Sequence, residues 1–401
     1  MPNRAPSFPR YLNPLPHSGF WGTLAFEPPC VRMLFRMDSL CLAQTLFSIA
    51  EIMGESVSIK IDDNTYLPNF GFVIFSDREN NYESDVIENK GISKKELIKA
   101  LEKDGIINIF DVKANNKRTF VDCLLNRNVD IESLYHLIRK SIPMLPSRRR
   151  AKSFLNVLSY TTTENATKLL CQKSMRRIGL MNRFIFIKDN LLNRDDSFNE
   201  TFETIIKTSL QISKKHKETI FRITASDKND IDSNCNNINL MLKEIPFIKD
   251  NIRNLSELYR STSIKIYCIL RFLKKDSFPN SPNWAWSHAD VLARKLINEK
   301  IYLLEKISKN KLLYKNLSEF LKPREIIASR EIQRKFQYAD KAVLHSYINH
   351  FLELEILSKQ LCTRFKGKKL PQLFHVVGER IDTDGGIKWE LYPPSVMIQD
   401  F

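Results

Sequence analysis

The pattern of hydrophobic and polar positions changes its period near residue 190. Before that point, short runs rich in β-branched and aromatic residues alternate with helix-like stretches, and residues 70–75 (Phe-Gly-Phe-Val-Ile-Phe) are apolar throughout. Such a run is typical of a strand buried on both faces, as in a parallel sheet. Beyond residue 190, apolar residues recur at helical spacing, as in 255–273 and 287–307. The pattern predicts an α/β part with a mainly parallel sheet, then a helical bundle, in a chain that is α-rich overall.

The same patterns predict the individual elements before residue 323. A serine at position 93, with Glu96 three residues later, forms a capping box that begins a helix. We expect strands at residues 56–61, 70–75, 118–125, 154–160 and 182–187, and further helices at 163–173, 198–212, 234–243, 255–273 and 287–307.

The C-terminal pattern is that of a small mixed domain. A short basic helix at residues 329–336 is followed by a second helix capped by Asp340, and then by two strands at 357–365 and 373–377. Helix, helix, strand and hairpin is the order of a winged helix, whose second helix enters the major groove while its wing contacts the backbone. A protein-docking role is the alternative. The expected nucleic-acid-binding residues are Arg330, Arg334 and Lys335 on the first helix and Lys366, Lys368 and Lys369 in the wing.

Composition and these elements divide the chain into four parts. Residues 1–37 are rich in proline and arginine and contain one acidic residue, Glu27, so we expect a flexible basic leader. A mitochondrial presequence, or a true start at Met33 or Met37, is the alternative. The other parts are an α/β core at residues 38–190, a helical domain at 191–322 and a winged-helix-like domain at 323–401.

The net charge of +16 is concentrated in two blocks. Residues 141–188 and 251–322 hold nearly all of the excess of lysine and arginine. Clustered cations neutralise phosphates and release counterions, so they favour a nucleic-acid partner, which we expect to be DNA. The alternative is a lysine-rich surface that meets only solvent. In the first block, the expected nucleic-acid-binding residues are Arg148, Arg149, Arg150, Lys152, Lys173, Arg176 and Arg177.

Several classes of chemistry lack their motifs in this sequence. There is no G-x-x-x-x-G-K-[ST] phosphate loop, no H-E-x-x-H pair and no G-x-S-x-G nucleophile turn. The seven cysteines never form a C-x-x-C, which predicts reduced thiols and no metal site. No run approaches the roughly 18 apolar residues of a membrane-spanning helix. We therefore expect a cytoplasmic chain without a membrane partner.

Two acids follow the apolar run at residues 70–75. Asp77 and Glu79 would lie at the carboxyl end of this strand, where acids of parallel sheets hold metal ions or polarise water. A metal-dependent nuclease could use them. Acids directly after a strand are also ordinary turn residues.

Three segments together resemble a known family. They are the strand that ends in Ser76-Asp77-Arg78-Glu79, residues 154–163, and Gly179-Leu-Met-Asn-Arg183-Phe. In order and spacing they are similar to the second half of the P-loop helicase module in primase-helicase-like proteins of prophages and plasmids. The resemblance implies a partial P-loop-like sheet, a helical bundle and a winged-helix-like end. It implies that Asp77 or Glu79 is the Walker B acid, that Thr161 or Thr162 senses the γ-phosphate, and that Arg183 is an arginine finger or a sensor arginine.

The phosphate-binding half of that module is absent from the sequence, which leaves three hypotheses. The first is a nucleic-acid-binding relative of primase-helicases that does not hydrolyse ATP alone. The second is a winged-helix DNA-binding initiator or regulator with a scaffold α/β domain. The third is an NTPase completed by another chain or by upstream sequence, and only then do we expect ATP and Mg²⁺ as cofactors. Beyond DNA, the expected partners are a second copy of the chain or a replication protein.

Overall fold

The computed structural model describes residues 12, 24–25, 27–61, 64–76, 99, 105–111, 119–125, 138, 153–171, 181–189, 196–216, 219–223, 225–245, 248, 251–275, 284–322, 325–337, 339, 341–360, 373–383 and 386–391. The chain divides into two compact units, residues 1–304 and residues 305–401.

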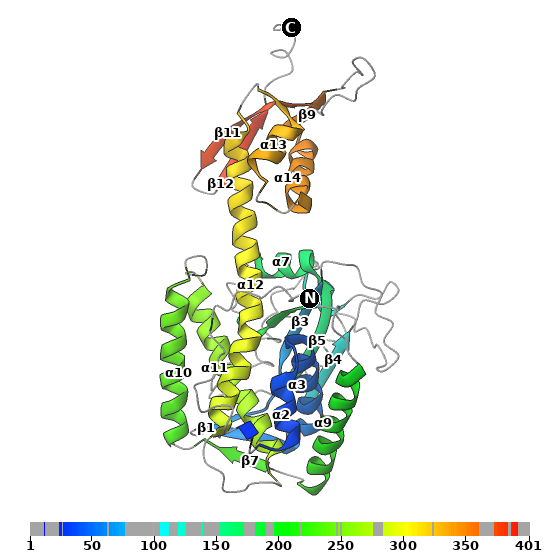
Figure 1. Ribbon diagram of the computed structural model, residues 1–401, viewed down its shortest axis with the longest axis vertical. Coiled ribbons are helices and arrows are strands. Elements are labelled where there is room, and N and C mark those ends of the chain that lie inside the picture. Colours follow the sequence, from blue (N-terminus) through cyan, green and yellow to red (C-terminus); the bar gives the residue numbers. More distant parts are fainter. Residues whose placement is uncertain are drawn as a thin grey trace, which may run out of the picture. The chain divides into compact units, whose positions relative to one another are not determined.

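A parallel sheet of four strands forms the centre of the first unit (Figure 1). Its strands lie in the order β4 (Gly105–Asp111), β5 (Ser153–Thr162), β3 (Gly71–Ser76) and β6 (Ile185–Lys188), and each neighbouring pair is parallel. All six residues of β3 are buried, as expected for a central strand. The prediction of a helix-rich α/β chain with a parallel sheet is confirmed.

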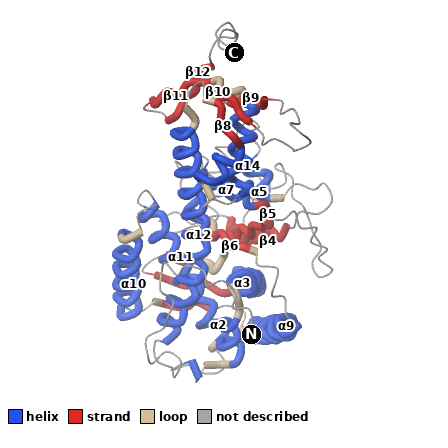
Figure 2. Tube along the Cα trace, turned by 45° about the horizontal axis from the view of Figure 1, so that its top comes forward, coloured by secondary structure: helices blue, strands red, loops and turns tan. Residues whose placement is uncertain are grey.

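Helices cover both faces of this sheet (Figure 2). Helix α3 (Ser39–Met53) packs on β5 and β6, where the Asn156 side-chain amide donates to the Phe47 carbonyl at 3.2 Å. Helices α5 (Phe120–Leu125) and α7 (Thr163–Cys171) pack on each other and on β5 from the other side. The two faces of β5 therefore meet different helices.

One local prediction about this sheet is wrong. Residues 118–125 were expected as a strand because they are β-branched and aromatic, but residues 120–125 form helix α5, which buries Phe120, Val121 and Leu124. Their spacing puts all three side chains on one side of a helix, so packing outweighs local preference. Strand β1 (Val57–Ile61) lies outside the main sheet, in a second sheet of order β2-β1-β7. Its partners are β2 (Asn64–Tyr66), which is antiparallel, and β7 (Thr219–Arg222), which is parallel.

The helices after the sheet pack into the same unit. They are α9 (Asp196–Lys215), α10 (Ala225–Lys243), α11 (Ile252–Leu273) and the part of α12 (Trp284–Phe320) up to residue 304; the rest of α12 belongs to the second unit. Helices α9 and α11 both contact α3, and α10 runs beside α11. The helical part therefore shares one compact unit with the sheet, whereas the sequence suggested a boundary at residue 190.

Described residues of the expected leader are also part of the first unit. Helix α2 (Pro29–Arg36) buries Cys30, Val31 and Leu34. The backbone of Leu12 exchanges hydrogen bonds of 2.8 and 2.9 Å with the side chain of Asn298. The prediction of a flexible leader therefore does not hold for these residues. Proline-rich composition concealed a short buried helix that begins with a proline in its first turn.

The second unit contains a three-stranded antiparallel sheet of order β8-β10-β9. Its elements after α12 are β8 (Ile326–Ala328), α13 (Ser329–Lys335), α14 (Lys341–Glu353), β9 (Leu357–Gln360) and β10 (Leu373–Val376), followed by the hairpin of β11 (Gly378–Thr383) and β12 (Gly386–Leu391). Leu313 and Leu317 near the end of α12 join Ile332, Phe351 and Phe374 in the core of this unit.

Candidate functional site

The strand order of the parallel sheet marks one edge for ligand binding. Along the chain, β3 is followed by β4, two places away on one side, whereas β5 is followed by β6, two places away on the other side. The connections that leave β3 and β5 therefore run in opposite directions, each past the other strand, and ligands of open α/β sheets bind outside the carboxyl ends of the strands. In the register of the two strands, Ser76 pairs with Thr162 and Phe75 with Thr161. The candidate site lies at this edge.

Two buried hydroxyl groups lie near the carboxyl end of β5, at the same edge of the sheet. Ser159 and Thr161 alternate with Tyr160, so both lie on the face of β5 opposite α3, whose Gln44 donates to the Tyr160 hydroxyl at 2.6 Å. Among the described residues, neither hydroxyl has a hydrogen-bond partner. Ser159 is fully buried and Thr161 is 9% exposed. Leaving a buried hydroxyl unpaired costs free energy, so such a pair invites a functional explanation.

Thr162 has a different task from Thr161. Its hydroxyl accepts a hydrogen bond from the Asn165 backbone N–H at 3.2 Å, which caps the first turn of α7. The sequence could not choose between the two threonines as the phosphate sensor. In the structure, the Thr162 hydroxyl accepts this hydrogen bond, whereas the Thr161 hydroxyl has no partner among the described residues.

Acids end or follow three of the four parallel strands. Asp77 and Glu79, the expected Walker B acids, lie outside the described residues, directly after β3. Sequence analysis missed Asp111, which ends β4 and pairs in register with Ser159. It also missed Asp189, a buried residue after β6 whose backbone N–H donates to the Phe75 carbonyl at 2.8 Å. Their position after a strand, the same signal that singled out Asp77, could have found both. In the described part of the chain, no group of three His, Cys, Asp or Glu side chains could hold a metal ion.

Arg183 lies at the opposite end of the sheet. It is the last residue of the short helix η2 (Met181–Arg183), directly before β6 begins. A Cβ atom added to Gly71, the first residue of β3, would lie 3.2 Å from the Arg183 carbonyl and 2.7 Å from the Phe184 ring. Six strand residues, roughly 20 Å, separate this end from Ser76. The structure therefore does not bring Arg183 together with Thr161.

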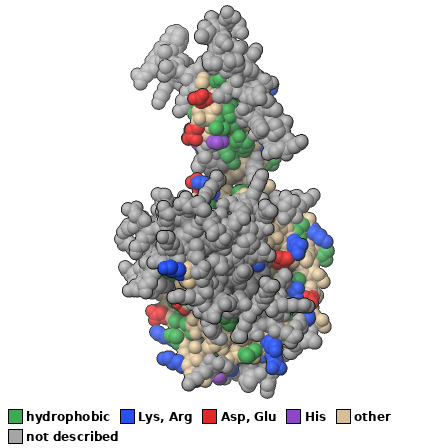
Figure 3. Space-filling model, turned by 180° about the vertical axis from the view of Figure 1, so that it is seen from behind, with side chains coloured by type: hydrophobic (Ala, Val, Ile, Leu, Met, Phe, Trp, Pro, Cys, Tyr) green, Lys and Arg blue, Asp and Glu red, His purple; other side chains and the backbone are tan. Residues whose placement is uncertain are grey.

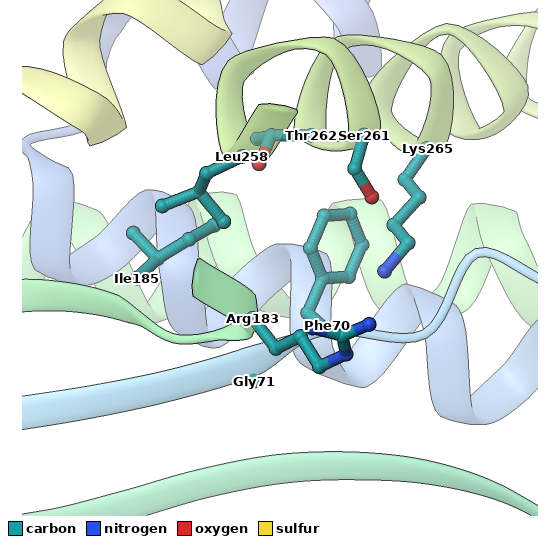
Figure 4. A pocket seen from close by; sticks show the side chains of 8 residues that line it. All are labelled: Phe70, Gly71, Arg183, Ile185, Leu258, Ser261, Thr262 and Lys265. Carbon is teal, nitrogen blue, oxygen red and sulfur yellow. The ribbon is translucent and has the colours of Figure 1, made fainter. Parts of the chain in front are cut away.

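The side chain of Arg183 instead lines a small cavity beneath helix α11. Lys265 of that helix lines the same cavity, and sequence analysis did not single it out. The other lining residues are Phe70, Gly71, Ile185, Leu258, Ser261 and Thr262 (Figure 4).

The basic candidates are only partly within the described residues. Arg330, Arg334 and Lys335 are exposed on α13. On the face shown in Figure 3, the described lysine and arginine side chains of residues 1–304 lie in several separate places rather than in one patch. The candidates outside the described residues are Arg148, Arg149, Arg150, Lys152, Lys173, Arg176, Arg177, Lys366, Lys368 and Lys369.

Helix α14 carries a polar stripe that sequence analysis missed. Lys341, His345 and Asn349 are all exposed and follow one another at intervals of four residues, so they share one side of the helix. Leu344 and Ile348 of the same helix are buried in the core of the second unit. The stripe could have been found from the same helical period that predicted the apolar positions.

No model of a known protein family matches the chain, and no curated protein matches it either. No helix within the described ranges is both long and apolar enough to cross a membrane.

Proposed function

We propose that the chain is a DNA-binding protein whose residues 305–401 bind duplex DNA through helix α14. The observation that carries this proposal is the exposed stripe of Lys341, His345 and Asn349 on the second helix of a small helix-and-hairpin unit. The order of elements supports it, because the end of α12, β8, α13, α14, β9 and β10 follow one another as a winged helix requires.

The chemistry of the stripe suits the major groove. An asparagine pairs with the edge of adenine through two hydrogen bonds, and a lysine donates to guanine or to a phosphate. Leu344, Ile348 and Phe351 anchor α14 in the core of this unit, while Lys341, His345 and Asn349 are exposed on the adjacent part of the helix surface. Arg330 and Arg334, exposed on α13, are placed to contact phosphates.

Replacing Lys341, His345 and Asn349 together with alanine should weaken the binding of the full chain to a random-sequence DNA duplex by about 10- to 100-fold, or about 1.4–2.8 kcal/mol in total, because the variant loses a phosphate-binding cation and two hydrogen-bonding side chains. Fluorescence anisotropy over a range of salt concentrations measures this loss. Lys315→Ala is the matched control, since it removes one exposed cation from α12 in the same unit. Equal losses in the triple variant and the control would rule out recognition by α14.

A second function, nucleotide binding as in primase-helicases, is supported by the edge between β3 and β5. The carboxyl ends of the parallel strands, and the hydroxyls of Ser159 and Thr161 that have no partner among the described residues, favour a phosphate ligand there. Because the sequence has no phosphate loop, we expect binding without turnover by this chain alone.

Thr161→Val tests this second function. The substitution keeps the shape of the side chain and should weaken the binding of a fluorescent ATP analogue by about 5- to 30-fold, the equivalent of about 1–2 kcal/mol for one hydrogen bond. The stability of the fold should be unchanged or higher, because an unpaired hydroxyl is removed.

Thr162→Val is the control for this experiment. It should cost about 1 kcal/mol of stability through loss of the α7 cap and leave nucleotide affinity unchanged. A wild-type chain that does not bind the analogue would remove this function and leave DNA binding untouched.

A further inference from the structure

The cavity between η2 and helix α11 brings two cations together inside the first unit. Lys265 and Arg183 approach it from opposite walls, and in Figure 4 their charged ends point toward the same space beside the Phe70 ring. Lys265 is only 6% exposed. Its ammonium lies 5.7 Å from the centre of the Phe70 ring.

Lys265 lacks the partner that a buried cation requires. Within the described part of the chain, its ammonium has no hydrogen bond and no ion pair. Burial, and then the positive charge of Arg183, lower the pKa of Lys265 from 10.5 to about 7. A buried cation normally has an acid beside it, because desolvation of an unpaired charge is costly.

Among the described residues, the remaining walls of the cavity supply donors and apolar surface but no acid. Ser261 and Thr262 of α11 contribute hydroxyl groups, whereas Phe70, Gly71 and Ile185 contribute no charge from the sheet side. The charge that acts on Lys265 is therefore that of Arg183 alone among the described groups. A site with two cations, two hydroxyls and no carboxylate has the chemistry of an anion site.

We propose that this cavity binds one small monovalent anion, of the size of chloride, between the Lys265 ammonium and the Arg183 guanidinium. The volume of the cavity, about 10 Å³, corresponds to one water molecule and excludes a nucleotide. A halide is little larger than water and needs no covalent chemistry. Its negative charge offsets the repulsion between the two cations and ties α11 to the start of β6.

Anion binding is then linked to protonation of Lys265. The anion binds the charged amine, so its affinity is highest below the pKa of the free site and falls above it. With that pKa at about 7, the affinity should fall about tenfold for each further pH unit. Arg183 keeps its charge throughout this range.

Thermal unfolding of the full chain in chloride-free buffer, titrated with sodium chloride or sodium bromide, tests the proposal. The wild type should show a saturable rise in Tm at about pH 6 that fades above about pH 7. Lys265→Met should lose this response. Lys300→Met is the matched control, because Lys300 is also buried with its pKa lowered to about 7, but it donates to the Phe184 carbonyl and does not line the cavity. It should retain the response.

Bromide soaked into crystals of the wild type gives a second measurement that needs no variant. An anomalous peak between Lys265 and Arg183 supports the proposal even if Lys265→Met does not fold. No peak there would overturn it, as would a halide response of equal size in wild type and Lys265→Met.

Discussion

Glu27→Ala is expected to lower the free energy of unfolding by about 3–5 kcal/mol, the usual cost of removing one partner from a buried ion pair. Glu27 forms an ion pair with the Lys274 ammonium and lies 3.2 Å from Nδ1 of His288. The three side chains are at most 5% exposed. Without the carboxylate, the charge of Lys274 stays buried and unneutralised. Urea denaturation measures the loss.

A matched control separates this effect from the removal of any acid. Glu257→Ala removes an acid from an exposed pair with Arg253 on α11 and should cost less than about 1 kcal/mol. If the two variants lose stability equally, the buried pair is not important for the fold.

Lowering the pH should weaken the ion pair between Glu27 and Lys274. Burial alone would raise the pKa of Glu27, but hydrogen bonds from His288 and Lys274 outweigh it and hold the pKa below 4.5. The stabilisation is therefore complete above 4.5 and is lost as the pH falls through the lowered value. In Glu27→Ala, the free energy of unfolding should fall less steeply with decreasing pH than in the wild type.

Raising the pH from about 7 to about 9 in chloride-free buffer should increase the stability of the fold by about 2–3 kcal/mol for each of two buried lysines. Burial lowers the pKa of Lys265 and of Lys300 from 10.5 to about 7. In this range the unfolded chain binds more protons than the folded chain, so unfolding becomes less favourable as the pH rises. This gain in the free energy of unfolding is complete above pH 10.5 and is lost as the pH falls toward 7.

Chemical denaturation at several pH values measures how steeply the free energy of unfolding rises with pH. Lys300→Met should roughly halve it, and stability that is flat or falling from pH 7 in the wild type would contradict the prediction. Above about pH 9 the effect is opposed by thiols such as Cys235, because burial raises its pKa from 9.0 to about 11 and the unfolded thiol ionises first.

The predictable part of the fold follows from long or uniform patterns. The fully apolar run of β3 and the long apolar stripes of α11 and α12 left little ambiguity, because burial on two faces and helical period are distinct signals. Short elements gave no such signal. Helix α5 has six residues, fewer than two turns, so its strand-like composition decided the prediction, and strand β4 was missed altogether.

The candidate site was predictable by position but not by geometry. The acids Asp77 and Glu79 were singled out because they follow an apolar strand, whereas Thr161 and Thr162, at the end of β5, came from the resemblance to the helicase module. Only the fold shows that one of these threonines caps a helix and that Arg183 ends the short helix η2 at the opposite end of the sheet. Lys265 gave no signal, because a lysine in an amphipathic helix is ordinarily exposed.

The contacts of Leu12 and Glu27 also set an order of events during synthesis. Their partners, Asn298 and Lys274, lie 286 and 247 residues further along the chain. At ribosomal speed the early segment therefore waits roughly 12–60 s for the helices that bury it. Until then these contacts are absent, and the first unit cannot complete its core before Asn298 has emerged. Chaperones that bind nascent chains have that interval in which to bind the segment.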